Sequence, residues 1–248
     1  MKNVITYYFE KQQQDICDFL QYQMEIGLAL GWDPRDILIV SNRKIKYKNV
    51  KSIIVKFPKH EWSKYIYRTY SFLHLFKELK INDIIWYHDW DTIQMEPLDY
   101  ILPEDKDLAA YYGYYYQRKK QPNGGSMFIR PSFIDILEKW QTEHLKTKHD
   151  TTEPSLQVVI KDQLHRIEHL PAEYNIGEYS FGHRMKEAKK PIKAFHFKIT
   201  RPKYVKKFLP RIIKQATKYE NTAKVLEILI KYLKKWKHKH PEIEQIFK

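Results

Sequence analysis

In the first 92 residues, short apolar runs alternate with segments of helical periodicity, which is the pattern of an α/β protein. Apolar residues recur every three or four positions over 12–30 and 66–76, which predicts two amphipathic helices. Four apolar runs around these helices are read as strands: 4–9, 37–40, 53–57 and 84–88. The order strand, helix, strand, strand, helix, strand predicts one half of a doubly wound sheet, because helices cross over between parallel strands.

After residue 92 the predicted strands become shorter and more widely spaced. We expect an aromatic strand over 108–116, a turn at Asn123 to Ser126, and further strands over 127–129, 167–170 and 194–197. Two helices are expected to start at Pro131-Ser132, with Ser132 as the N-cap, and at Thr152-Glu153. A polar loop is expected between these helices, over 142–152. Lysine-rich helices are expected from residue 201 onward, with an apolar stripe that includes Leu229, Ile230 and Leu233.

The fourth predicted strand, over 84–88, is followed directly by two carboxylates, Asp89 and Asp91. In open α/β sheets, ligands bind beyond the carboxyl ends of the strands. Two carboxylate oxygens suit Mg²⁺ or Mn²⁺, which keep coordination positions open for substrate phosphates. The alternative is a solvated pair of acids at a strand-to-loop turn, because aspartate favours turns.

The charge balance of the chain indicates an anionic partner. The 248 residues carry a net charge of +14, with a pI of about 9.5, and 43% of them are hydrophobic. Residues 201–248 contain 14 Lys and Arg against four Glu, so most of the excess charge lies there. Nucleic acid, an acidic membrane or a phosphorylated substrate would each fit this charge.

The sequence also gives an expectation for the compartment. The single cysteine, Cys17, cannot form an intrachain disulfide, and the N-terminal apolar run is too short for a signal peptide. No apolar stretch reaches 18 residues. We therefore expect a cytoplasmic protein that could also rest on a membrane as a peripheral protein.

Six short motifs follow one another along residues 3–205. They are Thr6-Tyr7-Tyr8, Tyr67-Arg68-Thr69-Tyr70, Tyr87-His88-Asp89-Trp90-Asp91, Asn123-Gly124-Gly125-Ser126-Met127, Leu170-Pro171 to Tyr174-Asn175, and Phe195-His196-Phe197. In order and spacing this series resembles the GT-A glycosyltransferases, especially the glycogenin-like and lipopolysaccharide-galactosyltransferase-like group. The resemblance implies a Rossmann-like mixed sheet flanked by helices. It places a catalytic domain at 1–204, with a nucleotide-binding half (1–92) and an acceptor half (93–204), before a basic helical extension at 205–248.

The resemblance also implies an activity and a set of site residues. A sugar would move from a nucleoside-diphosphate donor, such as a UDP-sugar, to a hydroxyl of a glycan or lipid-linked acceptor. Asp89, Asp91 and His196 would hold Mn²⁺ or Mg²⁺, which would neutralise the diphosphate leaving group. Tyr7 and Tyr8 could stack on the base, and Arg68 could reach a phosphate or the ribose. The alternatives are ordinary packing at a strand end for the two tyrosines and a solvated helix face for Arg68. The full set of expected donor-binding residues is Thr6, Tyr7, Tyr8, Arg68, Asp89, Trp90, Asn123, Gly124, Lys198 and Lys203.

The catalytic base is expected near the start of the helix at residue 153. Retaining members of the group carry an Asp-Gln-Asp-like element there, and this chain instead has Asp150-Thr151-Thr152-Glu153-Pro154-Ser155. The departure slightly favours an inverting hexosyl- or deoxyhexosyltransferase, with Glu153 as the general base and Asp150 as second candidate. Alternatively, Glu153 only complements the helix dipole.

Two other functions remain open from the sequence. A metal-dependent nuclease or nucleotidyltransferase would also use paired carboxylates, and a basic nucleic-acid-binding protein would also carry excess lysine. Nucleic acid is the less expected partner, because the excess charge is concentrated in 201–248 and not around the acidic pair. In the segment 205–248, we expect the apolar stripe to pack against the catalytic domain rather than enter lipid, while the lysines stay outside and can contact an anionic membrane surface.

Overall fold

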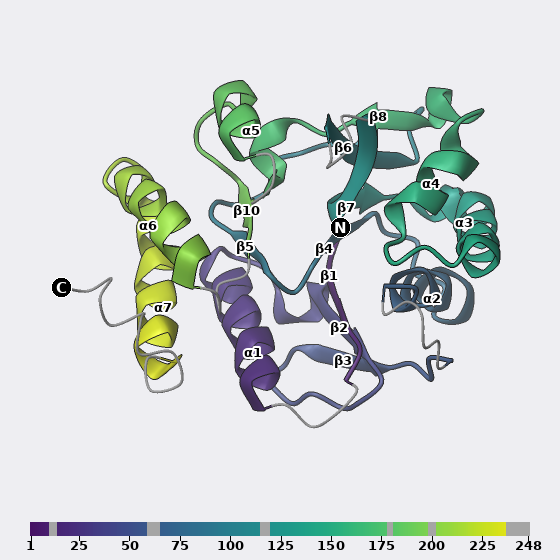
Figure 1. Cartoon of the computed structure of the whole chain (residues 1–248). Coiled ribbons are helices and arrows are strands. Elements are labelled where there is room, and N and C mark those ends of the chain that lie inside the picture. Colours follow the sequence, from purple (N-terminus) through teal and green to yellow (C-terminus); the bar gives the residue numbers. More distant parts are fainter. Residues whose placement is uncertain (10–13, 59–64, 115–119, 178–180, 198–201, 237–248) are drawn as a thin grey trace. The chain divides into compact units, whose positions relative to one another are not determined.

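The computed structural model describes residues 1–9, 14–58, 65–114, 120–177, 181–197 and 202–236, and all structural statements concern these residues. They form an α/β protein with one sheet of seven strands and one of three (Figure 1). The chain divides into two compact units, each built from separate stretches of sequence. The first unit contains Met1–Gln13, Pro34–Trp90 and Tyr100–Pro171, and the second contains Gln14–Asp33, Asp91–Asp99 and Ala172–Lys248.

The first unit is organised around the seven-stranded sheet, in the order β3-β2-β1-β4-β7-β6-β8. The strands are β1 (Lys2–Tyr7), β2 (Ile37–Ser41), β3 (Lys51–Ile54), β4 (Ile85–His88), β6 (Leu108–Tyr114), β7 (Lys120–Ile129) and β8 (Ile167–His169). The first four run parallel, whereas β7 is antiparallel to both β4 and β6, so the sheet is mixed. Every residue of β2 and β4 is buried, which explains their near-continuous apolar sequences.

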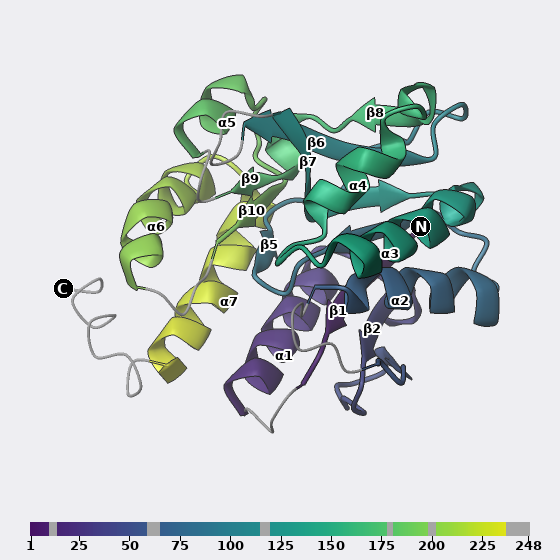
Figure 2. The same ribbon diagram turned by 45° about the vertical axis from the view of Figure 1, so that its right-hand side comes forward.

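Helices of the first unit cover one face of this sheet. They are α2 (Tyr67–Leu73), its π-helical continuation (His74–Glu78), α3 (Ile134–Thr147) and α4 (Glu153–Ile160), with short 3-10 turns at Pro34–Asp36, Pro131–Phe133 and Leu164–Arg166. Phe72, Trp140 and Leu156 from the three helices pack with Tyr87 of β4 in a single core. Figure 2 shows α2, α3 and α4 beside the strands that they cover.

The second unit holds the small sheet, in the order β5-β10-β9, together with four helices. Its elements are α1 (Gln14–Ala29), β5 (Thr92–Gln94), a 3-10 turn (Ala172–Tyr174), β9 (Ile176–Gly177), α5 (Phe181–Glu187), β10 (Ala194–His196), α6 (Pro202–Ala216) and α7 (Glu220–Trp236). β10 is antiparallel to β5 and parallel to β9. The C-terminal helices belong to this unit, since Leu229 and Leu233 are buried and Glu25 of α1 accepts hydrogen bonds from Lys231 and Tyr232.

Two buried contacts fix the C-terminal helices to the small sheet. Phe208 of α6 stacks on Phe197, with ring centroids 4.5 Å apart, and meets Phe195 edge-on at 5.8 Å. Glu96, just after β5, accepts hydrogen bonds from the backbone N–H (2.9 Å) and the hydroxyl (2.5 Å) of Thr222 in the first turn of α7. A carboxylate at this position satisfies otherwise unpaired N–H groups and complements the helix dipole.

The structure confirms the predicted fold class, a mixed α/β sheet flanked by helices, and corrects several local predictions. The turn expected at Asn123 to Ser126 is wrong, because these residues lie inside β7. There the register with β6 shifts between Ala110 and Tyr111, so the Gly-Gly pair marks an irregularity and not a strand end. The connection between the two strands falls in 115–119, outside the described residues.

Two further corrections concern α3. The expected polar loop over 142–152 is shorter, since α3 continues to Thr147 and ends at Lys148, which has a left-handed backbone with φ of 52°. Ser132 does not act as an N-cap; its hydroxyl donates to Asp107 instead. The boundaries expected at residues 92 and 204 stay predictions. None of the described helices combines the length and the hydropathy needed to cross a membrane.

Candidate active site

The alternation of β4 decides where its terminal carboxylate points. Tyr87 faces the core, where its ring meets Phe72 edge-on at 4.9 Å, and Asp89, two residues later, follows the same side. The Tyr87 hydroxyl donates to Asp89 Oδ1 at 2.5 Å, and the backbone N–H of Asp89 donates to Gly125 O at 3.0 Å. Asp89 is only 17% exposed, so the alternative of a freely solvated acid is wrong for this residue.

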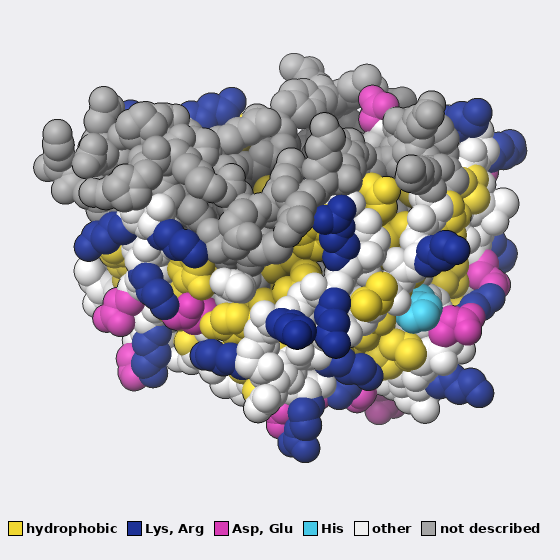
Figure 3. All heavy atoms as spheres, turned by 90° about the horizontal axis from the view of Figure 1, so that it is seen from below, with side chains coloured by type: hydrophobic (Ala, Val, Ile, Leu, Met, Phe, Trp, Pro, Cys, Tyr) yellow, Lys and Arg dark blue, Asp and Glu magenta, His cyan; other side chains and the backbone are white. Residues whose placement is uncertain are grey.

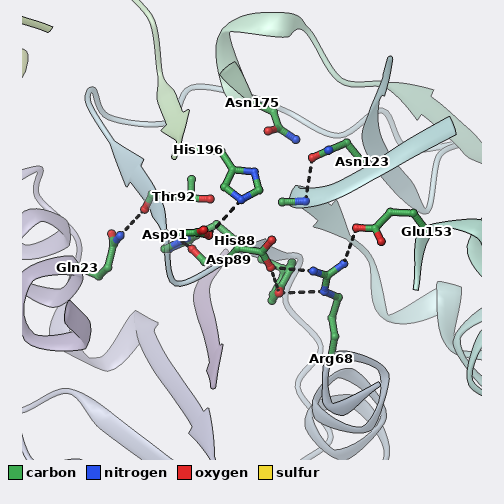
Figure 4. Close-up of polar contacts among 12 residues, drawn as sticks. Gln23, Arg68, His88, Asp89, Asp91, Thr92, Asn123, Glu153, Asn175 and His196 are labelled. Atoms are coloured by element: carbon green, nitrogen blue, oxygen red, sulfur yellow. Dashed lines mark hydrogen bonds and ion pairs between the residues drawn. The ribbon is translucent and has the colours of Figure 1, made fainter. Parts of the chain in front are cut away.

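A buried arginine joins this strand end to the start of α4 (Figure 4). Arg68 of α2 is 2% exposed, and its Nη2 donates to Asp89 Oδ1 at 2.8 Å. Its Nη1 donates to Glu153 Oε1 at 3.3 Å and to Thr152 Oγ1 at 3.2 Å, while Nε donates to the Tyr87 hydroxyl at 3.0 Å. The alternative of a solvated helix face for Arg68 is therefore wrong.

The glycine at position 124 makes this arrangement possible. A Cβ atom on Gly124 would lie 1.9 Å from Arg68 Nη1 and 2.8 Å from Glu153 Oε1, distances that no side chain could occupy. The neighbouring Asn123 accepts a hydrogen bond from the Gly125 N–H at 3.0 Å and so stabilises the irregular part of β7. The Asn-Gly-Gly sequence thus gives the guanidinium a place to lie against the strand backbone.

The charges of this cluster support one another. Burial alone would lower the pKa of Arg68, but Asp89 and Glu153 hold it well above its usual value. Burial alone would raise the pKa of Glu153, but the positive charge of Arg68 and the hydrogen bonds to the carboxylate together outweigh that effect and lower the pKa. Both groups are therefore ionised at neutral pH, and the Glu153 carboxylate is a weaker base than an isolated one.

Asp91 and His196 face one another in the second unit. In the antiparallel pair of β5 and β10, His196 lies opposite Thr92, and the Phe197 N–H donates to Asp91 O at 3.0 Å. This register brings His196 Nε2 to 3.1 Å from Asp91 Oδ1, and Asp91 is 7% exposed. Phe197 packs against Phe208, so the alternation of the strand turns His196 to the opposite side.

Asp89, Asp91 and His196 have the chemistry of a metal-ligand set. Only Trp90 separates the two acids along the chain, so their carboxylates remain close neighbours through covalent geometry. Each of the three residues offers one ligand atom, and these atoms lie within 4.8 Å of one another. Two carboxylate oxygens and one imidazole nitrogen fit Mn²⁺ better than Mg²⁺, which prefers oxygen alone.

Aromatic rings gather at the carboxyl end of β1. The Tyr7 ring meets Trp90 edge-on at 6.0 Å and Phe9 at 4.7 Å, and the Tyr8 ring stacks on Tyr67 at 6.3 Å. Tyr7 and Tyr8 are half-buried, so each keeps part of its surface accessible. Thr6 is buried, and its hydroxyl has no hydrogen-bond partner within the described part of the chain.

The structure thus groups some of the expected site residues and leaves others apart. Arg68, Asp89, Gly124 and Glu153 form one cluster. Thr152 and Tyr87 also belong to it, although no sequence motif pointed to them. Asp150 is exposed in the segment before α4, and Lys203 is exposed on α6. Lys198 lies outside the described residues.

Comparison of structures places the fold among known proteins, whereas comparison of sequences does not identify a relative. No protein-family profile matches the chain, and a search of curated proteins returns no match. Solved structures do match. One is a glycosyltransferase involved in the glycosylation of the major capsid of PBCV-1, with a TM-score of 0.55 and 10% identity, covering 79% of this chain and 93% of that one.

Two further structures give the same result. Mouse xyloside xylosyltransferase 1 has a TM-score of 0.51 and 10% identity, with 79% of this chain and 97% of that chain covered. The glycosyltransferase GlyE of Streptococcus pneumoniae TIGR4 has a TM-score of 0.56 and 14% identity, with 81% of this chain covered but only 56% of GlyE. Likeness at such identities shows the fold, and it confirms the GT-A architecture that the ordered motifs implied.

The Arg68–Gly124 contact gives a first testable prediction. Gly124→Ala must displace the guanidinium from its partners, and the free energy of unfolding should fall by about 1–3 kcal/mol, as when a buried polar group is left unsatisfied. Urea unfolding measures the change.

Gly182→Ala is the matched control, because its Cβ would meet nothing within 4 Å on helix α5. This variant should be neutral or more stable by about 0.5–1 kcal/mol, since glycine is unfavourable within helices. Equal effects of the two substitutions would show that the Arg68 contact carries no special weight.

Proposed function

We propose that the chain is a glycosyltransferase that moves a sugar from a nucleoside-diphosphate donor to a hydroxyl of a glycan or lipid-linked acceptor. One observation carries the proposal: in a GT-A fold, the acid that ends β4 is followed two residues later by an acid paired with a strand histidine. Ligands of open α/β sheets bind beyond such strand ends. A hexosyl or deoxyhexosyl group is the proposed cargo.

The chain's own residues would hold the donor by its two ends. Asp89, Asp91 and His196 would bind a divalent cation, Mn²⁺ in preference to Mg²⁺, and the cation would neutralise the charge of the leaving diphosphate. Arg68 and Tyr87 both bind Asp89 Oδ1 and so orient that carboxylate. The base of a UDP-sugar would rest against the aromatic rings at the end of β1, because base faces stack on such rings.

Glu153 is the proposed general base of an inverting transfer. Its carboxylate begins α4 and is 16% exposed, so it remains accessible to an acceptor while Arg68 keeps it ionised. A carboxylate with a lowered pKa accepts a proton only as the acceptor oxygen attacks, when that hydroxyl becomes much more acidic. Asp150 remains the second candidate.

The proposed activity is tested by a screen of nucleotide sugars with Mn²⁺ for release of free nucleoside diphosphate. Asp91→Asn keeps the size of the side chain and should lower turnover by at least about 100-fold, since the loss of outer-shell partners alone costs 10–100-fold. EDTA should have the same effect on the wild-type chain. Turnover that survives both treatments would contradict the metal site, and the absence of turnover with every donor would contradict the transferase.

The base is tested by Glu153→Gln, which keeps the shape and loses proton acceptance. The rate of transfer should fall on the order of 10²–10⁴-fold, while donor affinity stays unchanged. Because the pKa of Glu153 is lowered, wild-type activity should not decline through this group until the pH falls below the ordinary pKa range of glutamate.

Asp150→Asn tests the second candidate: if Glu153 is the base, this exposed residue can be changed with little loss of rate, and a loss as large as that of Glu153→Gln would assign the base to Asp150 instead. The anomeric configuration of the product, read by NMR, gives an independent check. Retention of configuration would rule out Glu153 as the base of an inverting reaction, whatever the variant does.

An anionic membrane is the proposed surface partner, and its contact would lie on α6. Within 202–218 there are six exposed cations and no acid: Lys203, Lys206, Lys207, Arg211, Lys214 and Lys218. Four of them, Lys203, Lys207, Arg211 and Lys214, recur every three or four residues within α6, so they share one face of the helix. Lys231 of α7, by contrast, is already bonded to Glu25. On the molecular face drawn in Figure 3, Lys and Arg also outnumber the acids.

Vesicle co-sedimentation tests this surface. Each lysine near an anionic leaflet contributes roughly 1 kcal/mol, so Lys203, Lys206, Lys214 and Lys218 changed together to Gln should abolish salt-reversible binding to phosphatidylserine vesicles. The matched control removes four lysines from α7: Lys224, Lys231, Lys234 and Lys235. Equal losses in both variants would point to net charge alone, and binding to neutral vesicles would exclude an electrostatic contact.

A further inference from the structure

The candidate metal ligand His196 belongs to β10, whose neighbour β9 in the small sheet has only two residues. β9 pairs in parallel with β10, so that Ile176 lies opposite Phe195 and Gly177 lies opposite His196. So short a strand contributes few ladder hydrogen bonds and needs support from neighbouring side chains. The backbone position of His196 therefore depends on the groups that hold β9.

A buried arginine holds the residue just before β9. Arg184 of α5 is 2% exposed, and its Nη1 donates to the backbone oxygen of Asn175 at 2.6 Å and to Asn175 Oδ1 at 3.2 Å. Asn175 itself is fully buried. Both hydrogen bonds come from Nη1, whose position is fixed by the planar guanidinium. A single nitrogen of Arg184 therefore binds both the backbone and the side chain of Asn175.

Gly177 leaves space for that guanidinium. A Cβ atom on Gly177 would lie 3.1 Å from Arg184 Nη1 and 3.7 Å from Cζ. The shorter distance is tighter than ordinary carbon contacts, so a side chain here would push either the arginine or the strand. The residue that provides the space is the one that lies opposite His196 in the sheet.

The helix that carries Arg184 is itself fixed in place. Phe181, in the first turn of α5, meets Phe208 of α6 edge-on at 4.6 Å. Phe208 also stacks on Phe197, the residue after His196. One aromatic ring of α6 thus supports both α5 and the strand that presents the histidine, which leaves Arg184 little freedom to move relative to β9.

We propose that Arg184 is a positioning residue for His196, acting through Asn175 and Gly177 on the backbone of β10. The inference rests on the proposed metal site, in which His196 is a ligand. Groups that orient metal ligands without touching the metal typically contribute 10–100-fold to metal affinity. Arg184 would act in this way through the backbone rather than through the imidazole ring.

The first measurement is Mn²⁺ affinity of the full chain, followed by the electron paramagnetic resonance signal of free Mn²⁺. Arg184→Met keeps the length of the side chain and removes its hydrogen bonds, and it should raise the Kd about 10-fold or more. Arg166→Met is the matched control, because Arg166 bonds to Asp107 and Asp135 in the first unit. This control should lose stability while the Kd stays unchanged.

The second measurement needs no metal and no activity. The ring C–H resonance of His196, assigned with His196→Asn, should shift in metal-free Arg184→Met and stay in place in Arg166→Met. If the wild-type chain binds no Mn²⁺, the proposed metal site fails, and this resonance alone then decides the role of Arg184.

Circular dichroism establishes which variants are folded. If Arg184→Met is not folded, Arg184→Lys and Gly177→Ala are judged by the same two measurements. A folded variant with a Kd within about twofold of wild type and an unshifted His196 resonance overturns the proposal, because the 10–100-fold effect of a ligand-orienting group is then absent.

Discussion

The first unit depends on one buried guanidinium. Arg68 lies between the end of β4 and the start of α4, and each of these elements contributes a carboxylate to it. Removing one partner of such a buried pair typically costs about 3–5 kcal/mol, because a charge is left without compensation in a poorly solvated place. The same contact links α2 to the end of β4 and to the start of α4, and it leaves no room for a side chain at Gly124 of β7. Arg68 therefore both stabilises the fold and orients residues of the candidate site.

Arginine reaches this position because Arg68 shares the buried face of α2 and its π-helical continuation with Phe72 and Leu75, which follow it four and seven residues later. The apolar repeat of Ile66, Tyr70, Leu73 and Phe76 predicted the buried face, yet Tyr70 and Leu73 are half-exposed and Arg68 is buried. A pattern of apolar residues does not count a cation as a buried position. It therefore identifies the helix but not the charged side chain on its buried face.

The sequence predicted most of the fold because its buried strands are long apolar runs that end in polar residues. It also placed the histidine strand and the two acids in order. It could not predict the partners of these groups. No sequence pattern indicates that Thr152 and Tyr87 would both accept hydrogen bonds from Arg68. Nor does any pattern indicate that the Asn-Gly-Gly sequence would continue a strand rather than end it. These outcomes depend on three-dimensional neighbours that are distant along the chain.

The second unit is assembled from three distant stretches of sequence, and this sets an order of events during synthesis. Glu96 can form its hydrogen bond only after Thr222, 126 residues later, has been synthesised. Likewise, the buried side of β10 is covered only after Phe208 has been added to the chain. The stretches of the first unit end at Pro171, so they are complete while the small sheet still lacks two of its strands and both C-terminal helices. Domains generally fold as units as the chain emerges, and contacts that span long sequence distances form slowly. The nascent chain would therefore carry its aspartates long before their histidine is in place, and the proposed metal site would be complete only after most of the chain has been synthesised.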